Sequence, residues 1–386
     1  MLRPQGSVIT TEFAVIGAGI AGASVAYELS ATAPVVVLER EPHAGYHATG
    51  RSAALFSEIY GNTLVRALSR AGRRFLFEPP AGFTDGPLLV PRGVLYIANA
   101  GQRQSLEEFR RAPDVARDTR ELPAAEGLRM VPILRESSLA HCAYEPAAMD
   151  VEAHGLHQGY LRGLRARGGR VLTHSAVESV RRTAQGWSIV AGTATIEARV
   201  LINAAGAWAD ELAQLAGVRP IGIEPKRRTA LLLQPPAGLA VERWPMVIDI
   251  DETFYFKPDA GKLLLSPADE TPSAPCDAQP EDLDVAIAVD RFENATTVSV
   301  DRVTHSWAGL RTFVADRSPV AGFDPDDQAF FWLVGQGGYG FQTAPALSRV
   351  AAALALGREV DSDIREQGVA AEALSPARLN PARYGV

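Results

Sequence analysis

The stretch that most constrains the fold is FAVIGAGIAGASVAYELSATAPVVVLER, residues 13–40. Its pattern predicts a short buried strand over residues 13–16, a glycine turn, a helix from about Ile20 and a second strand over residues 35–38. Gly17, Gly19 and Gly22 follow the G-x-G-x-x-G spacing within this unit. A strand, glycine turn, helix and strand in this order open a Rossmann-type α/β domain.

Each residue of this turn has a physical role in binding a dinucleotide. Gly17 permits the tight turn, Gly19 lets a pyrophosphate approach the backbone, and Gly22 lets the helix pack closely on the strand. The helix start at Ile20 and Ala21 directs free N–H groups and the positive end of the helix dipole at the phosphates. Glu39 follows the second strand, where an acid can bind a ribose hydroxyl. The fingerprint predicts an adenine dinucleotide and leaves NAD and FAD open.

The loop after Glu39 favours a flavin. An NAD enzyme usually returns to a third strand through a helix here, whereas this chain runs through Thr49, Gly50, Arg51, Ser52, Ala53 and Ala54. Small residues allow the backbone to lie against a large flat ring system and to donate N–H bonds along its edge. Residues 53–56 are also too apolar for an ordinary exposed loop.

Two distant segments repeat the pattern of a strand that runs into small residues and a helix. A strand over residues 200–204 leads into Ala205, Gly206 and Ala207. A second strand, over residues 331–334, leads into GQGGYG, residues 335–340, and a helix from about Thr343. Such a helix start can stabilise negative charge at the edge of a reduced flavin.

Composition bounds the remaining possibilities. The chain has 386 residues, which suggests two domains, and its net charge of -7 argues against nucleic acid as a partner. No apolar run is long enough for a membrane span, and the N-terminal MLRPQGSVITTE has no apolar signal-peptide core. Cys142 and Cys276 are predicted to be free thiols in a reducing compartment. We therefore expect a cytoplasmic protein, either a monomer or a small homo-oligomer, with a long surface loop over residues 269–280.

The whole chain resembles the D-amino-acid oxidase/glycine oxidase group of FAD-dependent oxidoreductases, and within it most resembles the D-arginine dehydrogenases. The likeness is collinear and rests on VIGAGIAGAS, VVVLERE, GYHATGRSAA, LHQGYLRG, NAAGAWAD, AGVRP, PKRR, FYFKPDAG, WAGLRTFVAD and QGGYGFQT. It implies an α/β fold in which a Rossmann-type FAD-binding domain is interleaved with a β-sheet-based (α+β) substrate-binding domain. The implied boundaries are residues 1–85, 148–222 and 305–386 for the FAD-binding domain, and residues 86–147 and 223–304 for the substrate-binding domain.

The resemblance also implies the residues of the site. Arg228 and Arg311 match arginines that bind a substrate carboxylate, which suits their planar, bidentate guanidinium groups. Tyr60 and Tyr255 match hydroxyl donors, and the backbone carbonyl of Gly338 matches an acceptor for the substrate amine. The implied FAD contacts are Gly17, Gly19, Ile20, Ala21, Gly22, Glu39, Arg40, Gly50, Arg51, Ser52, Ala53, Ala54, Val177, Ala205, Gly206, Trp208, Arg311, Gly337, Gly338, Tyr339, Gly340 and Gln342.

The side-chain pocket departs from the resemblance. Its implied lining is Leu55, Ser57, Val94, Met246, Ile248 and Gln342. Val94 stands where D-arginine dehydrogenases carry the glutamate that binds the substrate guanidinium, and Leu55 replaces a histidine. Without the glutamate, a buried cationic side chain loses its partner and is strongly disfavoured. We expect a preference for D-amino acids with neutral, apolar or aromatic side chains over D-Arg, unless Glu58 compensates.

The predicted reaction is oxidative deamination. A hydride passes from Cα to flavin N5, and the imino acid hydrolyses to a 2-oxo acid and ammonia. We expect non-covalent FAD, because neither cysteine lies in the flavin-facing C-terminal segments, and no metal, because His154 and His157 lack a third ligand. The electron acceptor is either oxygen or a quinone, and a quinone would allow contact with the inner face of a membrane.

Three alternatives stay open. The first is oxidation of N-substituted amino acids of the sarcosine or opine type. The second is oxidation of 2-hydroxy acids, which would want a base for the hydroxyl proton, and His305 is a weak candidate for it. The third, from a different class, is a flavin-binding protein without catalysis.

Overall fold

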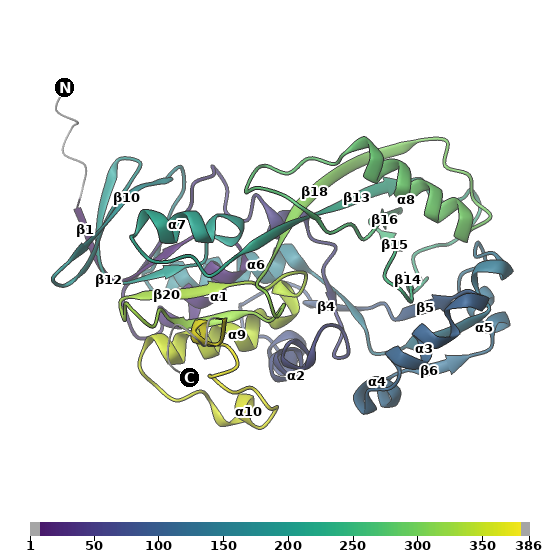
Figure 1. Ribbon diagram of the computed structural model, residues 1–386, viewed down its shortest axis with the longest axis horizontal. Coiled ribbons are helices and arrows are strands. Elements are labelled where there is room, and N and C mark those ends of the chain that lie inside the picture. Colours follow the sequence, from purple (N-terminus) through teal and green to yellow (C-terminus); the bar gives the residue numbers. More distant parts are fainter. Residues whose placement is uncertain (1–7, 380–386) are drawn as a thin grey trace.

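The computed structural model describes residues 8–379, and these form two lobes that lie side by side (Figure 1). One lobe carries the glycine turn and the C-terminal helices. The other carries the long strands and helices from the middle of the chain. The first seven residues of the N-terminal stretch considered above lie outside the described residues.

The first lobe is built on an eight-stranded sheet with a parallel centre in the order β20-β12-β1-β2-β9. An antiparallel hairpin, β10-β11, extends one side of it, and β19 pairs with β20. The strands are β1 (Val8–Ile16), β2 (Val35–Leu38), β9 (Arg170–Leu172), β10 (Val177–Thr183), β11 (Gly186–Ala191), β12 (Ala194–Asn203), β19 (Val320–Phe323) and β20 (Phe330–Val334).

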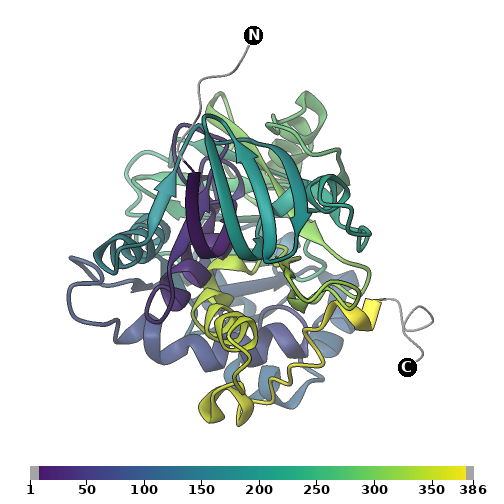
Figure 2. The same cartoon turned by 90° about the vertical axis from the view of Figure 1, so that its left-hand side faces the viewer.

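Helices cover both faces of this sheet because its central strands are apolar on both sides. Phe13 and Val15 pack into one core with α1 and α9, whereas Ala14 and Ile16 pack into a second core with α7. Figure 2 views this lobe from its own side, with the sheet above the C-terminal helix α9. The helices are α1 (Ile20–Leu29), α2 (Thr63–Phe77), α6 (Ala153–Ala166), α7 (Ala209–Leu215), α9 (Gly340–Ala355) and α10 (Ser362–Arg365).

The predicted strand, glycine turn, helix and strand are confirmed, with corrections to the boundaries. Strand β1 begins at Val8 and β12 begins at Ala194, earlier than expected, because their first residues pair with each other. Helix α9 begins at Gly340 and not at Thr343. Thr343 already lies inside the helix, where its N–H donates to the carbonyl of Tyr339 at 3.1 Å.

The second lobe is built on a nine-stranded mixed sheet in the order β17-β13-β16-β15-β14-β5-β7-β6, with β18 beside β13. Its β14-β5 pair is parallel and the others are antiparallel. The strands are β5 (Val94–Ala98), β6 (Arg120–Leu122), β7 (His141–Glu145), β13 (Glu224–Leu233), β14 (Met246–Asp249), β15 (Tyr255–Asp259), β16 (Lys262–Ser266), β17 (Thr271–Pro272) and β18 (Val303–Phe313). The helices of this lobe are α3 (Arg103–Phe109), α4 (Pro113–Asp118), α5 (Ala124–Met130) and α8 (Asp282–Ala295). The expected fold class is confirmed.

A three-stranded sheet formed by β3 (Leu55–Phe56), β8 (Met149–Val151) and β4 (Leu89–Pro91) draws together segments on both sides of the expected domain boundaries. The expected boundary at residues 304/305 falls inside β18, which pairs with β13 along its length. The division into domains stays a prediction. The predicted loop over residues 269–280 contains the short strand β17, which pairs with β13.

Candidate active site

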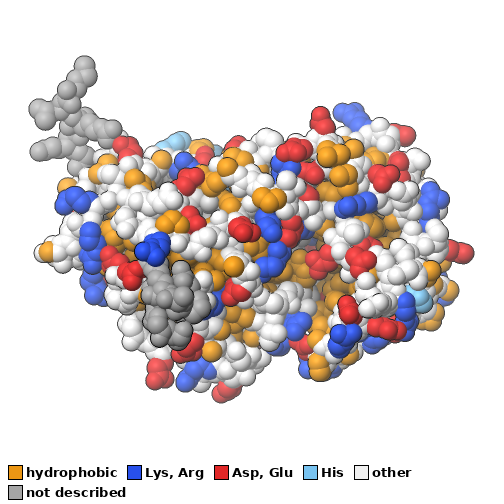
Figure 3. All heavy atoms as spheres, viewed as in Figure 1, with side chains coloured by type: hydrophobic (Ala, Val, Ile, Leu, Met, Phe, Trp, Pro, Cys, Tyr) orange, Lys and Arg blue, Asp and Glu red, His pale blue; other side chains and the backbone are white. Residues whose placement is uncertain are grey.

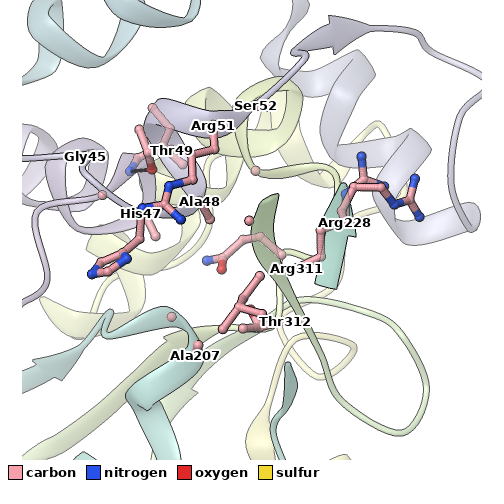
Figure 4. Close-up of a pocket in the computed structure, with 18 of the residues that line it drawn as sticks. Gly45, His47, Ala48, Thr49, Arg51, Ser52, Ala207, Arg228, Arg311 and Thr312 are labelled. Carbon is pink, nitrogen blue, oxygen red and sulfur yellow. Dashed lines mark hydrogen bonds between the residues drawn. The ribbon is translucent and has the colours of Figure 1, made fainter. Parts of the chain in front are cut away.

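A deep cleft lies between the glycine turn of the first lobe and strands β13 and β18 of the second. Figure 4 shows three parts of the chain around it: the segment from Gly45 to Ser52, Ala207 after β12, and Arg228, Arg311 and Thr312 from the two long strands. The predicted FAD contacts on its wall are Gly17, Gly19, Ile20, Ala21, Glu39, Arg51, Ser52, Ala53, Ala205, Gly206, Trp208, Arg311, Gly337, Gly338 and Gly340.

The glycines of the turn make a cradle that side chains would fill. Gly17 has φ of +103°, and a Cβ there would lie 2.5 Å from the carbonyl oxygen of Ala204. A Cβ on Gly22 would lie 1.8 Å from the carbonyl oxygen of Gly17, so the helix packs on the turn only with glycine here. Gly19 caps α1 without a side-chain hydrogen bond, and in this first turn the N–H of Ile20 donates to Thr49 Oγ1 and the N–H of Ala23 donates to the carbonyl of Gly19, each at 2.9 Å. These residues fit a pyrophosphate at the helix start.

Glu39 is held rigidly at the edge of this cleft. Its two carboxylate oxygens accept from the backbone N–H groups of Ala18 and Glu41, each at 2.9 Å. An adjoining hollow is lined by Arg40 and Val177 together with Trp208, and the Arg40 guanidinium lies 4.9 Å from the centre of the Trp208 ring. These residues would hold the adenosine end of a dinucleotide.

Gln336 supplies a second sign of a bound group. It lies on the wall of the cleft, and its Nε2 atom is buried without a hydrogen-bond partner within residues 8–379. A buried donor without an acceptor is costly unless a ligand satisfies it. The turn of residues 335–340 was predicted to meet the flavin, but Gln336 itself was not singled out.

Arg51 joins the two lobes over the cleft. Its Nη1 donates to the carbonyls of Ala278 and Ala308, each at 2.9 Å, and its Nη2 pairs with Asp277. All of these partners belong to the middle of the chain, so the loop over residues 269–280 forms one wall of the cleft. Gly50 and Ala54, also predicted FAD contacts, line a neighbouring cleft, and Ala54 also lines a smaller cavity with Gly338.

A smaller cavity opens beside Gly338 and brings the predicted catalytic side chains together. Tyr60, Arg228, Tyr255, Arg311 and Gly338 all line it. On the β13-β18 pair, Arg228 stands opposite Gly309 and Lys226 opposite Arg311. Arg228 and Arg311 therefore project from the same face, and Gly309 leaves the space between them open.

Glycine is also required at position 338. A Cβ there would lie 2.7 Å from Nη1 of Arg311, so a side chain would displace the guanidinium. The neighbouring Arg227 points to the opposite face of β13, where it pairs with Asp284 at 3.0 Å and with Glu281. Of the run Lys226-Arg227-Arg228, only Arg228 reaches the cavity.

The charges of the cavity favour an anion. Burial raises the pKa of Tyr60 above its usual value, against the positive charge of Arg311. Burial also acts to raise the pKa of Tyr255, but the charges of Arg311 and Arg228 outweigh it, and the pKa falls below its usual value. Burial alone would lower the pKa of Arg311, yet the two phenols keep it raised. Arg228 donates to the carbonyl of Asp269 at 2.8 Å through Nε and pairs with Glu270 at 3.4 Å through Nη2, so its other N–H groups could pair with a carboxylate.

A family model settles the class of the protein. The model described as FAD dependent oxidoreductase, DAO, matches residues 12–354. The chain belongs to this family. FAD is therefore the cofactor of this chain, and the chain is an oxidoreductase.

Relatives of this DAO-family chain differ in their substrates. It is 21% identical to glycine oxidase from Geobacillus kaustophilus over 92% of this chain and 95% of that enzyme. It is 23% identical to human mitochondrial sarcosine dehydrogenase over 87% of this chain, but this is only 38% of the human protein. The fold resembles that of L-proline dehydrogenase from P. horikoshii, with a TM-score of 0.81, 20% identity and coverage of 97% of this chain and 99% of that one. None of these comparisons shows the specific likeness to D-arginine dehydrogenase.

The structure places the predicted pocket residues of this DAO-family protein in two groups. Leu55, Met246 and Ile248 line the cavity as expected. Val94 is fully buried behind it, and Ser57 and Gln342 are buried and hydrogen-bond to each other.

Of the predicted FAD contacts, Gly22 is packed under the glycine turn, whereas the Tyr339 ring packs edge-on against Tyr60 at 5.0 Å between ring centres.

Three lining residues were missed. Tyr96 lies two positions after Val94, so it shares that face of β5, and it reaches the cavity where Val94 does not. Glu252 and Ala268 also line it, with φ of +54° and +53°. Such left-handed backbone is uncommon without glycine and clusters at functional sites. Only the strand alternation around Val94 could have indicated Tyr96, and no local signal marks the other two.

The cysteines and histidines need one correction. Cys142 is buried in the second lobe, which raises its pKa to about 11, but exposed Cys276 lines the cofactor cleft. The prediction of non-covalent FAD therefore loses part of its premise and stays a prediction. His157 contacts the carbonyl oxygen of Ala18 through Nε2 at 2.8 Å, as a structural residue of α6. Within residues 8–379, no group of three or more acids, histidines and cysteines could hold a metal.

His305, the weak candidate for a base, stacks on Trp307 and does not line the cavity. Within residues 8–379, no helix is both long enough and apolar enough to cross a membrane. On the face drawn in Figure 3, acidic and basic side chains are interspersed.

Proposed function

We propose that this protein oxidises D-amino acids to imino acids, which hydrolyse to 2-oxo acids and ammonia. One observation carries this proposal: two arginines and two tyrosines from distant strands and loops converge on a cavity beside Gly338, next to the cofactor cleft. A substrate carboxylate paired with Arg228 and Arg311 would be fixed by charge-assisted hydrogen bonds, with Tyr60 and Tyr255 as further donors.

The remaining groups suit an amine. FAD, when bound, accepts a hydride from the substrate Cα. The carbonyl of Gly338 would accept a hydrogen bond from the substrate amine and orient it. Among residues 8–379, no histidine lines this cavity. A hydroxy acid would need a base for its hydroxyl proton, so the cavity fits an amino acid better than a hydroxy acid.

We further propose a preference for neutral or apolar side chains over D-Arg. Leu55, Met246 and Ile248 give the cavity an apolar wall. Glu58, which could have replaced the missing acid, is bonded to Arg73 at 3.2 Å. Glu252 does line the cavity, but it is exposed, and water screens an exposed carboxylate strongly.

A second candidate is oxidation of N-substituted amino acids. The observation that favours it is the pair of relatives named for sarcosine and for L-proline, both of which are secondary amines. Such substrates would keep the carboxylate contacts and differ only in the room needed around nitrogen.

The test is anaerobic reduction of the flavin. The holoenzyme is mixed with single D- and L-amino acids, sarcosine, L-proline and 2-hydroxy acids, and the flavin absorbance is followed. We expect rapid bleaching by apolar D-amino acids and slow bleaching by D-Arg. Faster bleaching by D-Arg than by any other D-amino acid would overturn the side-chain preference, and bleaching by secondary amines alone would replace the first proposal with the second.

No bleaching by any compound would favour a flavin-binding protein without catalysis. Where a substrate does bleach the flavin, the rate at which oxygen or a soluble quinone reoxidises the reduced enzyme identifies the acceptor. We propose that either oxygen or a quinone is the electron acceptor. We also propose that the protein is cytoplasmic.

A further inference from the structure

A buried acid lies directly behind the substrate cavity. Glu145 ends strand β7 opposite Val94, and only 2% of it is exposed. Its Oε1 accepts from the Ser57 hydroxyl at 2.7 Å, and its Oε2 accepts from the Tyr96 hydroxyl at 3.1 Å. Both carboxylate oxygens are therefore used, each by a hydroxyl from a different part of the chain.

The two donors belong to the cavity or lead to it. Tyr96 lines the cavity itself, and its ring packs on Phe109 with centres 4.5 Å apart. Ser57 begins the turn that ends at Tyr60, and its hydroxyl also accepts from the N–H of Ile59 at 3.3 Å. Glu145 thus holds one wall of the cavity directly and the Tyr60 turn through Ser57.

Gln342 holds the other side of the same turn. Its Oε1 accepts from the N–H of Ser57 at 3.3 Å, and its Nε2 donates to the carbonyl of Tyr60 at 3.5 Å. Since Gln342 is buried in helix α9, this contact ties the turn to the first lobe, whereas Glu145 ties it to the second. A fully bonded buried network of this kind specifies one arrangement of its members.

Within residues 8–379, Glu145 takes part in no ion pair. The acids Asp118 and Glu58 add to the effect of burial and favour its neutral form. Each of these is paired elsewhere, Glu58 with Arg73 at 3.2 Å and Asp118 with Arg117 at 2.7 Å. Tyr96 is the other titratable group in contact. Burial raises the pKa of Glu145 to about 7, against the hydrogen bonds from Ser57 and Tyr96.

We propose that Glu145 is a positioning residue of the substrate cavity, which as a carboxylate fixes Tyr96 and the Tyr60 turn in the geometry that receives the substrate. The inference rests on the proposed function of this cavity. A protonated carboxyl has one oxygen that donates, so either Ser57 or Tyr96 must then give up its bond or reverse it. Substrate binding should accordingly tighten as the pH rises through about 7.

The experiment measures binding without turnover. The holoenzyme is titrated with isobutyrate, a carboxylate without an amine, and the Kd is read from the change in flavin absorbance between pH 6 and pH 8.5. We expect the wild-type Kd to fall with rising pH. In Glu145→Gln we expect the Kd at pH 8 to rise about tenfold and to lose its pH dependence, because an amide accepts through one atom only.

Two further variants test the network. Ser57→Ala removes one donor and should also raise the Kd for isobutyrate. In the double variant Glu145→Gln/Ser57→Ala, the Kd should be no higher than that of whichever single variant has the higher Kd, since both substitutions act through one network. The matched control is Asp324→Asn. This buried acid lies in the first lobe, where it accepts from Trp332 Nε1 at 3.1 Å, and its loss should leave the Kd unchanged.

A wild-type Kd that does not change with pH, or a Glu145→Gln Kd and pH profile equal to the wild type, would overturn the proposal. The outcome is separate from that of the reaction. If no amino acid reduces the flavin but the pH dependence of isobutyrate binding is lost in Glu145→Gln, positioning stands and the proposed reaction falls.

Discussion

The cofactor cleft and the substrate cavity are neighbours, but they are built in different ways. The cleft is made mainly of backbone: the glycine turn, the segment from Ala48 to Ser52 and the turn after β20 expose N–H groups and leave room for a ligand. The cavity is made mainly of side chains, with Arg228, Tyr255 and Arg311 from three strands of the other lobe and Tyr60 from a loop.

This difference in construction separates cofactor binding, which a family can share, from substrate preference, which can differ between its members. A backbone cradle depends on a few glycines at fixed spacing, so it binds the same cofactor throughout a family whose other side chains vary. A side-chain cavity changes its preference with a single residue. Two relatives of this chain fit this division, because the family model is that of FAD-dependent oxidoreductases while their names carry glycine and sarcosine.

Removing a cation of the cavity should give the largest effect. In Arg311→Met, the kcat/KM for the best amino acid should fall about 10³-fold, or about 4 kcal/mol, since a buried carboxylate would lose its bidentate partner. FAD content is measured beside the kinetics, because Arg311 also lies on the wall of the cofactor cleft. Steady-state kinetics with exposed Arg302→Met as the control checks this, and a loss smaller than about threefold would remove Arg311 from the carboxylate site.

Placing an acid behind the cavity should come next. Val94→Glu puts a second carboxyl beside Glu145 in an apolar cluster, so it should destabilise the protein by about 3 kcal/mol. It should bring no gain in D-Arg oxidation, because Val94 does not line the cavity. Denaturant unfolding and D-Arg kinetics beside Val94→Leu test both points, and efficient D-Arg oxidation by Val94→Glu would return this position to the pocket.

A change in the cradle should have a smaller effect on stability and act on the cofactor. Gly22→Ala forces a Cβ to within 1.8 Å of the carbonyl oxygen of Gly17 and should cost about 1–3 kcal/mol. The purified protein should also contain less FAD. Gly86→Ala is the matched control, since a Cβ there meets nothing within 4 Å. Equal FAD content in both variants would contradict a rigid cradle.

The smallest effect is expected from Cys276→Ser. If FAD is bound without a covalent link, acid precipitation should release the yellow colour into the supernatant from the wild type and from this variant alike. A wild-type pellet that stays yellow, with the colour lost in Cys276→Ser, would show instead that this thiol on the wall of the cleft is attached to the flavin.

Sequence reasoning succeeded where structure is local. The strand, turn and helix around Gly17 were predicted within a few residues, because glycine spacing and hydrophobic period are read within a short window. The five catalytic candidates came from resemblance. Without the resemblance, Arg228 would have been interpreted as one of three solvated charges in the run Lys226-Arg227-Arg228.

The wall of the cavity was decided only by the tertiary structure. Val94 and Tyr96 share a strand face, and the order β14-β5-β7 placed one behind the wall and the other on it. Glu145 approaches Ser57 across 88 positions of sequence, and Arg51 meets Ala308 across 257. Such contacts exist only after sheet order and register are set. The sequence and its resemblance therefore indicated the cofactor and the class of fold, whereas the packing of distant strands determined which side chains line the proposed substrate cavity.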